Sequence, residues 1–329
     1  MLLSFCIPAY NCDFAHLKDA VDSIYKIFEK YLLEGKAEII LSFDYDGDNK
    51  KLYEGYVKKI DAPNLKVFYQ SENRGMVGNW NFCVGESSGR YILVLGQDDV
   101  LRGTLDDYVN LIQCVEDNGC VAASLRRVFI DEAGKVFRRK LGLTDREFVF
   151  RGRDTILPRG SGVFACLSCG NLLGEPLCFM FRRDVFYDVG EYRNDFKHAA
   201  DLDLNLRFSL EGDIYISREI CNGRRIHPGN LTKRNAASGV LGRERWKIRE
   251  SYKNSLNLFQ RWTSLVYIFL NSLKDYMGSL RAGKYRFSVG KGKVQWLFRC
   301  FAAFCALPFY FVSVFLMKYY LLRSVNGGR

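Results

Sequence analysis

The sequence has no repeated C-x-x-C pair, no internal repeat and no low-complexity linker before residue 240. Its eleven cysteines are an odd number scattered along the chain, which favours a reducing compartment. The opening stretch Met1–Pro8 has no basic segment and is too short for a signal peptide, so we expect a first β-strand there and no export of this domain. Because 48% of the residues are apolar, disorder is excluded.

Acidic residues are in the minority: 37 Asp and Glu face 48 Lys and Arg, a net charge of +11. Such a balance favours anionic partners, namely nucleic acid, a membrane surface or phosphorylated substrates. The excess is densest after Arg218, and the first 120 residues do not share it. These basic residues form no recognised nucleic-acid motif and flank apolar helices, so we expect no nucleic-acid partner.

Apolar segments alternate with segments of helical spacing over the first 100 residues. Short apolar runs at 2–7, 38–43, 65–69 and 91–95 predict strands, and the apolar spacing within 14–33 predicts a helix between the first two. The alternation predicts an open parallel α/β sheet. The polar residues that follow these strands should converge on one edge of that sheet. They are Tyr10-Asn11, Asp44, Asn73 and Asp98-Asp99.

The stretch 91–99 organises this prediction, because its apolar run leads directly into Asp98 and Asp99. Adjacent carboxylates repel each other unless a cation lies between them, and a hard divalent cation bridging a diphosphate is a common solution. A capping role is the alternative: an Asp here could simply cap the helix that begins at Thr104.

The pattern is weaker in the second half. We expect a helix at 105–116, a strand at 121–130, a hairpin turn into 136–139, an active-site wall of loop and short helix at 154–173, a strand at 177–182, helices at 184–189 and 202–210, and a strand at 214–217.

Several short motifs follow one another in a fixed order. They are Ile7-Pro8-Ala9-Tyr10-Asn11, Asp44, Asn73-x-Gly75 with Gly78-Asn79-Trp80-Asn81, Gln97-Asp98-Asp99, Gly190-Glu191-Tyr192, the segment 201–207, and the segment 227–232. Together they resemble the family 2 glycosyltransferases of the GT-A fold, of the bacterial polysaccharide or lipopolysaccharide type. Members of that family transfer a sugar from a nucleotide-sugar donor with inversion. The resemblance covers about residues 2–235, so we expect a catalytic GT-A domain at 1–237.

The resemblance implies a donor site and a metal site. The donor would contact Pro8, Ala9, Tyr10, Asn11, Asp44, Gly75, Asn79, Gln97 and Asp98, and Asp99 with His227 would hold Mn²⁺ or Mg²⁺. The cation would stabilise the charge that grows on the diphosphate leaving group. Two positions depart from the family pattern. Gln97 replaces the first Asp of the metal motif, and Phe43 replaces an Asp near the nucleobase, which is usually uracil or thymine.

Inverting transfer also requires a base that deprotonates the acceptor hydroxyl. The family uses an Asp at the head of a helix about a hundred residues past the metal motif, and Asp201 fits. Asp203 is the competitor, although Arg207 four residues later offers it a structural partner. Asp201 could also cap its helix while acting as the base.

The resemblance ends near Ala237, and residues 238–329 are basic and apolar. Aromatic residues recur at helical spacing over 256–276, and Cys300–Met317 contains no charged residue. That run sits at the lower limit for crossing a bilayer, so a re-entrant hairpin or a buried helix is also open. The flanking Lys and Arg suit an anionic cytoplasmic leaflet, and we expect this region to associate with the cell membrane from that side.

The sequence therefore predicts a metal-assisted glycosyltransferase acting on a glycan or lipid-linked acceptor, with a UDP- or dTDP-sugar as donor. The alternative is a non-catalytic nucleotide-sugar-binding or scaffold subunit of a polysaccharide assembly complex. Phe43 and Gln97 favour that alternative, and the presence of Asp99 and Asp201 opposes it.

Overall fold

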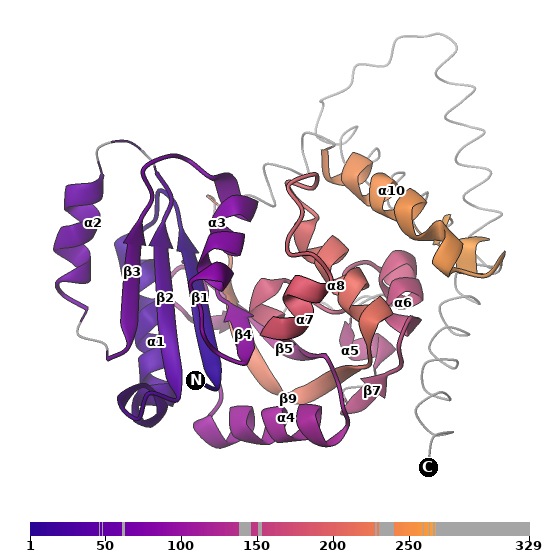
Figure 1. Ribbon diagram of the computed structural model, residues 1–329, viewed down its shortest axis with the longest axis horizontal. Helices are drawn as coiled ribbons and strands as arrows, with labels where there is room; N and C mark the ends of the chain where they lie inside the picture. Colours follow the sequence, from indigo (N-terminus) through magenta and orange to yellow (C-terminus); the bar gives the residue numbers. More distant parts are fainter. Residues whose placement is uncertain are drawn as a thin grey trace, which may run out of the picture.

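The computed structural model describes residues 1–45, 47, 49–60, 63–137, 146–150, 153–227, 229, 240–258, 260–262, 264–265 and 267. Over these residues helices cover both faces of one extended β-sheet (Figure 1). The expected α/β class with a central sheet is confirmed.

The first half of the sheet is parallel. Its strand order is β3-β2-β1-β4. The strands are β1 (Leu3–Ala9), β2 (Ala37–Phe43), β3 (Leu65–Tyr69) and β4 (Tyr91–Val94), and the helices among them are α1 (Phe14–Leu33), α2 (Lys50–Val57) and α3 (Gly75–Gly85). Strands β1, β2 and β4 are buried almost throughout, which explains why they appear in the sequence as mainly apolar runs without polar alternation.

The second half is mixed, so the expectation of a mainly parallel sheet is wrong beyond β4. The order continues β8-β5-β9-β7, with β8 antiparallel to both β4 and β5. The strands are β5 (Ala122–Ile130), β6 (Val136–Phe137), β7 (Thr155–Leu157), β8 (Phe179–Arg182) and β9 (Ile214–Arg225). The helices are α4 (Leu105–Asp117), α5 (Arg146–Val149), α6 (Ser161–Cys169), η1 (Pro176–Cys178), α7 (Arg183–Asp188), α8 (Ala200–Glu211), α10 (Val240–Tyr252) and η2 (Lys253–Ser255).

Strand directions decide which segments meet at the site. Strand β8 opposes both β4 and β5, and β9 is parallel to β5, so β4, β5 and β9 all run the same way. The carboxyl ends of β1, β2, β4 and β9 therefore lie on one edge of the sheet. The residues just before β8 lie there too, because β8 runs in the opposite direction.

Two hydrophobic clusters hold the layers together, one on each face of the sheet. On one face Phe5 of β1 packs with Ile24 of α1 and Tyr108 of α4. On the other, Cys6 belongs to a cluster with side chains of α3, α6 and α8, including Phe208. Adjacent residues of β1 thus point to opposite sides, as the pleat of a strand requires.

Helix α10 belongs to the second of these clusters. Its residues Ile248 and Tyr252, together with Leu256, are buried there among residues of α6 and α8. The expected apolar stretch Cys300–Met317 lies outside the described residues. Within the described part of the chain, no helix is both long and apolar enough to cross a membrane.

Candidate active site

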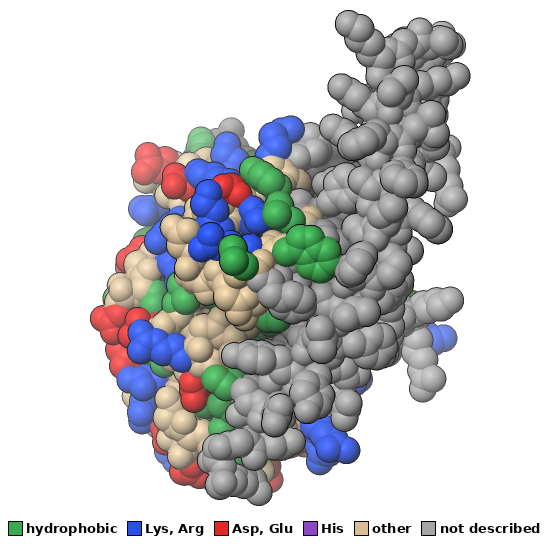
Figure 2. Space-filling view, turned by 90° about the vertical axis from the view of Figure 1, so that its right-hand side faces the viewer, with side chains coloured by type: hydrophobic (Ala, Val, Ile, Leu, Met, Phe, Trp, Pro, Cys, Tyr) green, Lys and Arg blue, Asp and Glu red, His purple; other side chains and the backbone are tan. Residues whose placement is uncertain are grey.

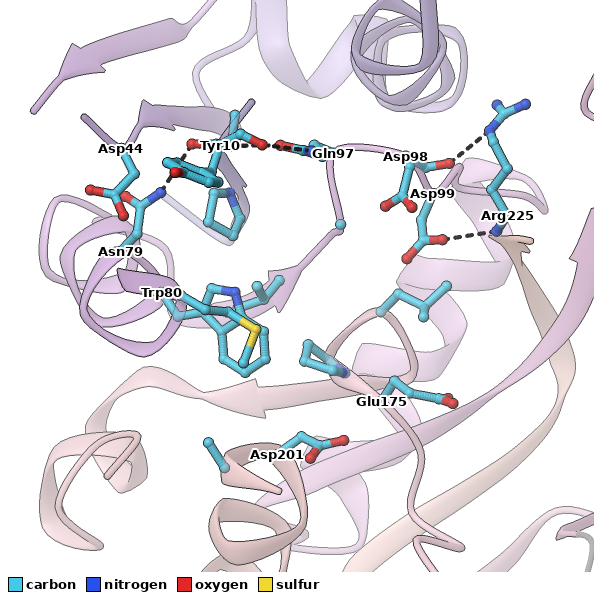
Figure 3. Close-up of a pocket in the computed structure, with 18 of the residues that line it drawn as sticks. Tyr10, Asp44, Asn79, Trp80, Gln97, Asp98, Asp99, Glu175, Asp201 and Arg225 are labelled. Carbon is cyan, nitrogen blue, oxygen red and sulfur yellow. Dashed lines mark hydrogen bonds between the residues drawn. The ribbon is translucent and has the colours of Figure 1, made fainter. Parts of the chain in front are cut away.

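A cavity of about 570 Å³ opens at the shared strand edge (Figure 3). The residues expected from the sequence that line it are Pro8, Ala9, Tyr10, Asp44, Gly75, Asn79, Gln97, Asp98, Asp99, Asp201 and His227. Asn11 is not among the lining residues; it lies in the turn after β1 with a backbone φ of +41°. The convergence of polar strand ends expected from the sequence is therefore seen in the structure.

Gln97 fixes the turn after β1. The Tyr10 N–H donates to Oε1 of Gln97 at 2.7 Å, and Nε2 of Gln97 donates to the Tyr10 carbonyl at 3.1 Å (Figure 3). The amide thus forms two reciprocal bonds, of which a carboxylate could form only the one that accepts a proton. This residue departs from the family pattern, and its amide ties the ends of β1 and β4 together.

Asp44 and Asn79 lock the neighbouring strand ends to α3. Asn79 is buried, and its Nδ2 donates to the Ser42 carbonyl at 3.1 Å. The Asp44 carboxylate accepts the Arg74 N–H at 2.8 Å, directly before α3 begins at Gly75. Gly75 has a φ of +69°, a conformation that glycine adopts without strain. Both side chains line the cavity and also hold its wall in place.

Phe43 takes no part in the lining of the cavity. Its ring is buried and stacked against Tyr53 at 4.4 Å between ring centroids and against Tyr69 at 5.4 Å. The side chain that replaces a family Asp therefore points into the hydrophobic core. Asp44 is the carboxylate that this segment presents to the cavity.

Asp98 and Asp99 are held by the end of β9. The Arg225 N–H donates to Oδ1 of Asp99 at 2.9 Å, and Nε of Arg225 donates to the Asp98 carbonyl at 2.8 Å (Figure 3). The cap of α4 is Thr104, whose side chain and backbone exchange hydrogen bonds with Asp107. The capping alternative for Asp98 and Asp99 is therefore excluded.

The electrostatics of this pair favour a bound cation. Burial, and then the charge of Asp98, raise the pKa of Asp99 to about 8. Nε2 of His227 lies 2.8 Å from Oδ2 of Asp98. A side chain at Gly96 would force these carboxylates to shift, because its Cβ would lie 2.7 Å from Oδ2 of Asp99 and 3.1 Å from Oδ1 of Asp98.

The donor set suits a cation that is shared with a substrate. Among the residues that the structure describes, no group of three or more His, Cys, Asp or Glu side chains is arranged to hold a metal ion. The site offers two carboxylates, and His227 lies beside Asp98. Mg²⁺ commonly binds through one or two carboxylates, with substrate phosphates and water completing the shell. The residues present therefore fit a cation that binds together with a diphosphate.

Asp201 enters the cavity from another direction. It is the second residue of α8, whose N-cap Ala199 forms no side-chain cap bond. Its Oδ2 accepts a hydrogen bond from Nδ2 of Asn171 at 3.0 Å. Burial is the main cause that raises the pKa of Asp201 to about 6, and the charge of Glu175 adds to the effect. A carboxylate with that pKa is ionised at neutral pH and still basic enough to accept a proton.

Asp203 lies in a different environment and does not line the cavity. It is fully buried, with Oδ2 accepting from Nε of Arg207 at 3.0 Å and Oδ1 accepting from the Tyr252 hydroxyl at 2.9 Å. The expected ion pair with Arg207 is confirmed, and the two candidate carboxylates face different surroundings.

The sequence analysis assigned no role in the site to several lining residues, namely Trp80, Glu175, His198, Arg224 and Arg225. Glu175 forms ion pairs with Arg224 and, at 2.8 Å, with Arg127. It was missed because it precedes the antiparallel strand β8, whose direction is not visible in the sequence. Asn171, the partner of Asp201, sits in a Gly-rich loop whose only signal was its position in the expected active-site wall.

The chain matches the profile of glycosyl transferase family 2 over residues 4–190, more than half of its length. It therefore belongs to this family. A protein of Mycobacterium tuberculosis, "Uncharacterized protein MT1568", is 28% identical over 254 residues, which are 74% of each chain.

Solved structures with 13–15% sequence identity share the fold. The mannosyltransferase PcManGT from Pyrobaculum calidifontis, in complex with GDP-Man and Mn²⁺, has a TM-score of 0.59 at 14% identity, over 97% of this chain and 84% of that one. S. aureus TarS 1-349 has a TM-score of 0.51 at 14% identity, over 89% and 95%. GalNAc-T7 with UDP, GalNAc and Mn²⁺ has 0.52 at 15%, over 69% and 44%.

Proposed function

We propose that this protein transfers one sugar from a nucleoside-diphosphate sugar to a glycan or lipid-linked acceptor, with inversion at the anomeric carbon. The observation that carries the proposal is that Asp98, Asp99 and Asp201 line one cavity at the strand edge. PcManGT was solved with GDP-Man and Mn²⁺, and TarS 1-349 was also solved with UDP-GlcNAc at a TM-score of 0.50. These relatives support a nucleotide-sugar donor, and UDP- or dTDP-sugars are the first to test.

Different residues of the cavity would contact the nucleotide, the diphosphate and the sugar of the donor. The donor's nucleotide would lie along the strand ends at Ala9, Tyr10 and Asp44, which places its diphosphate toward Asp98 and Asp99. Mn²⁺ or Mg²⁺ bound by these two carboxylates would offset the negative charge of the departing diphosphate. The sugar would then lie between the pair and Asp201.

Asp201 is the proposed general base. Its carboxylate takes the proton of the acceptor hydroxyl while that oxygen forms a bond to the anomeric carbon. The bond from this carbon to the diphosphate oxygen breaks, and the diphosphate leaves with the electron pair. Attack on the face opposite the leaving group inverts the configuration of the carbon.

A non-catalytic donor-binding subunit is the competing function. In the sequence, Gln97 and Phe43 favoured this competing function. In the structure, the contacts of each residue give it a structural role instead. Gln97 bonds to the Tyr10 backbone, and Phe43 is part of a stacked aromatic core. Neither departure removes a carboxylate on which the proposed chemistry depends.

Donor binding tests the proposal directly. We expect one sugar among a panel of UDP-, dTDP- and GDP-sugars to bind in the presence of Mn²⁺ and to bind at least about tenfold more weakly with chelator, measured by calorimetry. Asp99→Asn preserves the shape and the bond from the Arg225 N–H, so it should lose the metal-dependent part of the affinity and remain folded. Donor affinity that is unaffected by both chelator and this substitution would refute the metal assignment.

Two glycine substitutions provide a matched pair for the same titration. Gly96→Ala places a Cβ against both carboxylates and should also lose metal-dependent binding. Gly55→Ala, within α2 and with nothing within 4 Å of its Cβ, should leave donor binding unchanged. It should add up to about 1 kcal/mol of stability, because Ala favours the helix more than Gly.

A further inference from the structure

We propose that Glu244 of α10 is a positioning residue for Asp201. The inference rests on the proposed role of Asp201 as the base. If Glu244 has this role, α10 contributes to the catalytic centre, although it follows the domain boundary expected at residue 237.

The Glu244 carboxylate accepts hydrogen bonds from three consecutive backbone N–H groups. Oε1 of Glu244 accepts from Lys197 N–H at 3.0 Å, and Oε2 accepts from His198 at 2.8 Å and Ala199 at 3.0 Å. Glu244 itself is buried. Successive N–H groups that converge in this way form an anion-binding nest, and bonds to an ionised acceptor are stronger than those to a neutral one.

The bonded loop leads directly into the base. Ala199 is the N-cap of α8 and Asp201 is two residues further on, so a shift of the loop moves the carboxylate that faces the cavity. Ala199 has no side chain that could cap the helix, and its N–H is satisfied by Glu244. His198, between the bonded residues, lines the same cavity.

Other residues of α10 also reach α8 and the core around it. Glu244, Ile248 and Tyr252 recur every four residues, so they lie on one face of the helix. Ile248 is completely buried, and the Tyr252 hydroxyl bonds to Asp203 in the first turn of α8. Side chains of α10 therefore bond to the start of α8 on both sides of Asp201, at Ala199 and at Asp203.

Asn171 also holds Asp201, independently of Glu244. The loop that contains Asn171 lies close to the C-terminal part of the chain as well. Nδ2 of Asn171 bonds to both Asp201 and the Gly174 carbonyl. A Cβ on the neighbouring Gly170 would lie 2.6 Å from the Tyr267 hydroxyl. Segments beyond residue 237 thus approach both groups that fix the orientation of the base.

The test compares Glu244→Ala and Glu244→Gln with Glu250→Gln in single-turnover transfer. Glu250 lies on the same helix, away from the loop, and pairs with Arg249 and Lys253. We expect Glu244→Ala to lower the transfer rate by about 10- to 100-fold, the scale of loss for a misplaced catalytic group, at unchanged donor affinity. Glu244→Gln, which keeps one accepting oxygen, should recover part of the rate, and Glu250→Gln should equal wild type.

A double-mutant cycle separates positioning from a general structural effect. In an Asp201→Asn background, Glu244→Ala should cost less than about twofold, because the group that it positions is already disabled. Backbone amide exchange should become faster at 197–199 in Glu244→Ala, which measures the released loop directly.

Several outcomes would overturn the inference. Equal rates for wild type and Glu244→Ala would do so, as would an unchanged penalty in the Asp201→Asn background or unaltered amide exchange at 197–199. Loss of donor affinity in parallel with rate would also do so. A wild-type chain that transfers no sugar from any donor overturns the proposed function and this inference with it.

Discussion

At the residue scale, Asp201 shows how burial prepares a carboxylate for proton transfer. Its side chain is partly buried at the start of α8 where it faces the cavity, and reduced contact with water is the main reason that its pKa rises to about 6. Hydrogen bonds from the Leu202 backbone N–H and from Asn171 limit the rise, because they stabilise the charged form. The result is a base that is available at neutral pH.

The pH dependence of transfer follows from that pKa. Only the carboxylate accepts a proton, so kcat/KM should fall about tenfold per pH unit below about pH 6 and level off above it. Asp201→Asn should lose roughly 10²- to 10⁴-fold of the single-turnover rate and retain donor affinity. The measurement is a rate profile from pH 4.5 to 8.

Asp203→Asn is the control for this residue, since Asp203 lies outside the cavity. The neutral amide would keep only some of the hydrogen bonds that the carboxylate accepts from Arg207 and Tyr252. Its rate should stay within a few-fold of wild type in the folded protein. A greater loss for Asp203→Asn than for Asp201→Asn would show that Asp201 is not the base.

At the element scale, α8 is organised around a buried ion pair. From the sequence, Asp203 and Arg207 form an ordinary pair four residues apart, worth about 0.3 to 0.5 kcal/mol if exposed. In the structure, Asp203 is fully buried and Arg207 is 6% exposed. Arg207 also donates to the carbonyls of Val189 and Glu191, so it ties α8 to the end of α7 and the following turn.

Removing one member of this pair should therefore be costly. We expect Asp203→Ala to lower the free energy of unfolding by about 3 to 5 kcal/mol, because Arg207 would remain buried without its carboxylate. Urea denaturation of the soluble fraction measures the change.

The matched control is Asp22→Ala. Asp22 pairs with Lys18 at the same helical spacing on α1, but both side chains are more than half exposed. Its loss should cost no more than about 0.5 kcal/mol. Similar costs at the two sites would contradict the distinction between buried and exposed pairs.

At the scale of the whole molecule, positive charge and exposed apolar side chains coincide near the C-terminal part. The net charge is +11, and the exposed hydrophobic residues in and after α10 include Trp246, Leu258 and Leu265. The face in Figure 2 carries Lys and Arg side chains next to a group of hydrophobic ones. We propose on this basis, and on the composition of 238–329, that the protein associates with the cytoplasmic face of the cell membrane.

Vesicle sedimentation tests the association. The full chain should bind vesicles that contain anionic lipid in preference to neutral vesicles, and binding should weaken as salt is raised. A chain without residues 294–329 should bind more weakly while retaining donor binding, because every cavity-lining residue precedes position 230. Equal binding of both chains to both vesicle types would contradict the proposal.

Much of the parallel half of the fold was predictable from the sequence. The spans of α1 and β3 agree with the expected ones residue for residue, since period and caps are local properties of the chain. The strand ends with Asp44, Asp98 and Asp99 meet as expected, because parallel strands bring their carboxyl ends together.

The second half required the tertiary structure. Whether β8 runs parallel or antiparallel depends on how a long excursion packs back onto the sheet, and this direction brought Glu175 to the cavity. The extension of β9 to Arg225 places a backbone N–H on Asp99, 126 residues earlier in the chain.

The sequence by itself determined the fold class, the order of the first elements and which aspartates line the cavity, because these depend on periodicity and on motifs within short stretches. Only the tertiary structure decided the environments of those carboxylates. Asp201 and Asp203 are two residues apart in similar sequence, yet one faces the cavity and the other is buried against Arg207 and Tyr252. Burial and hydrogen bonding depend on groups that packing brings from distant parts of the chain, and so does the hold of Glu244 on the loop before the base.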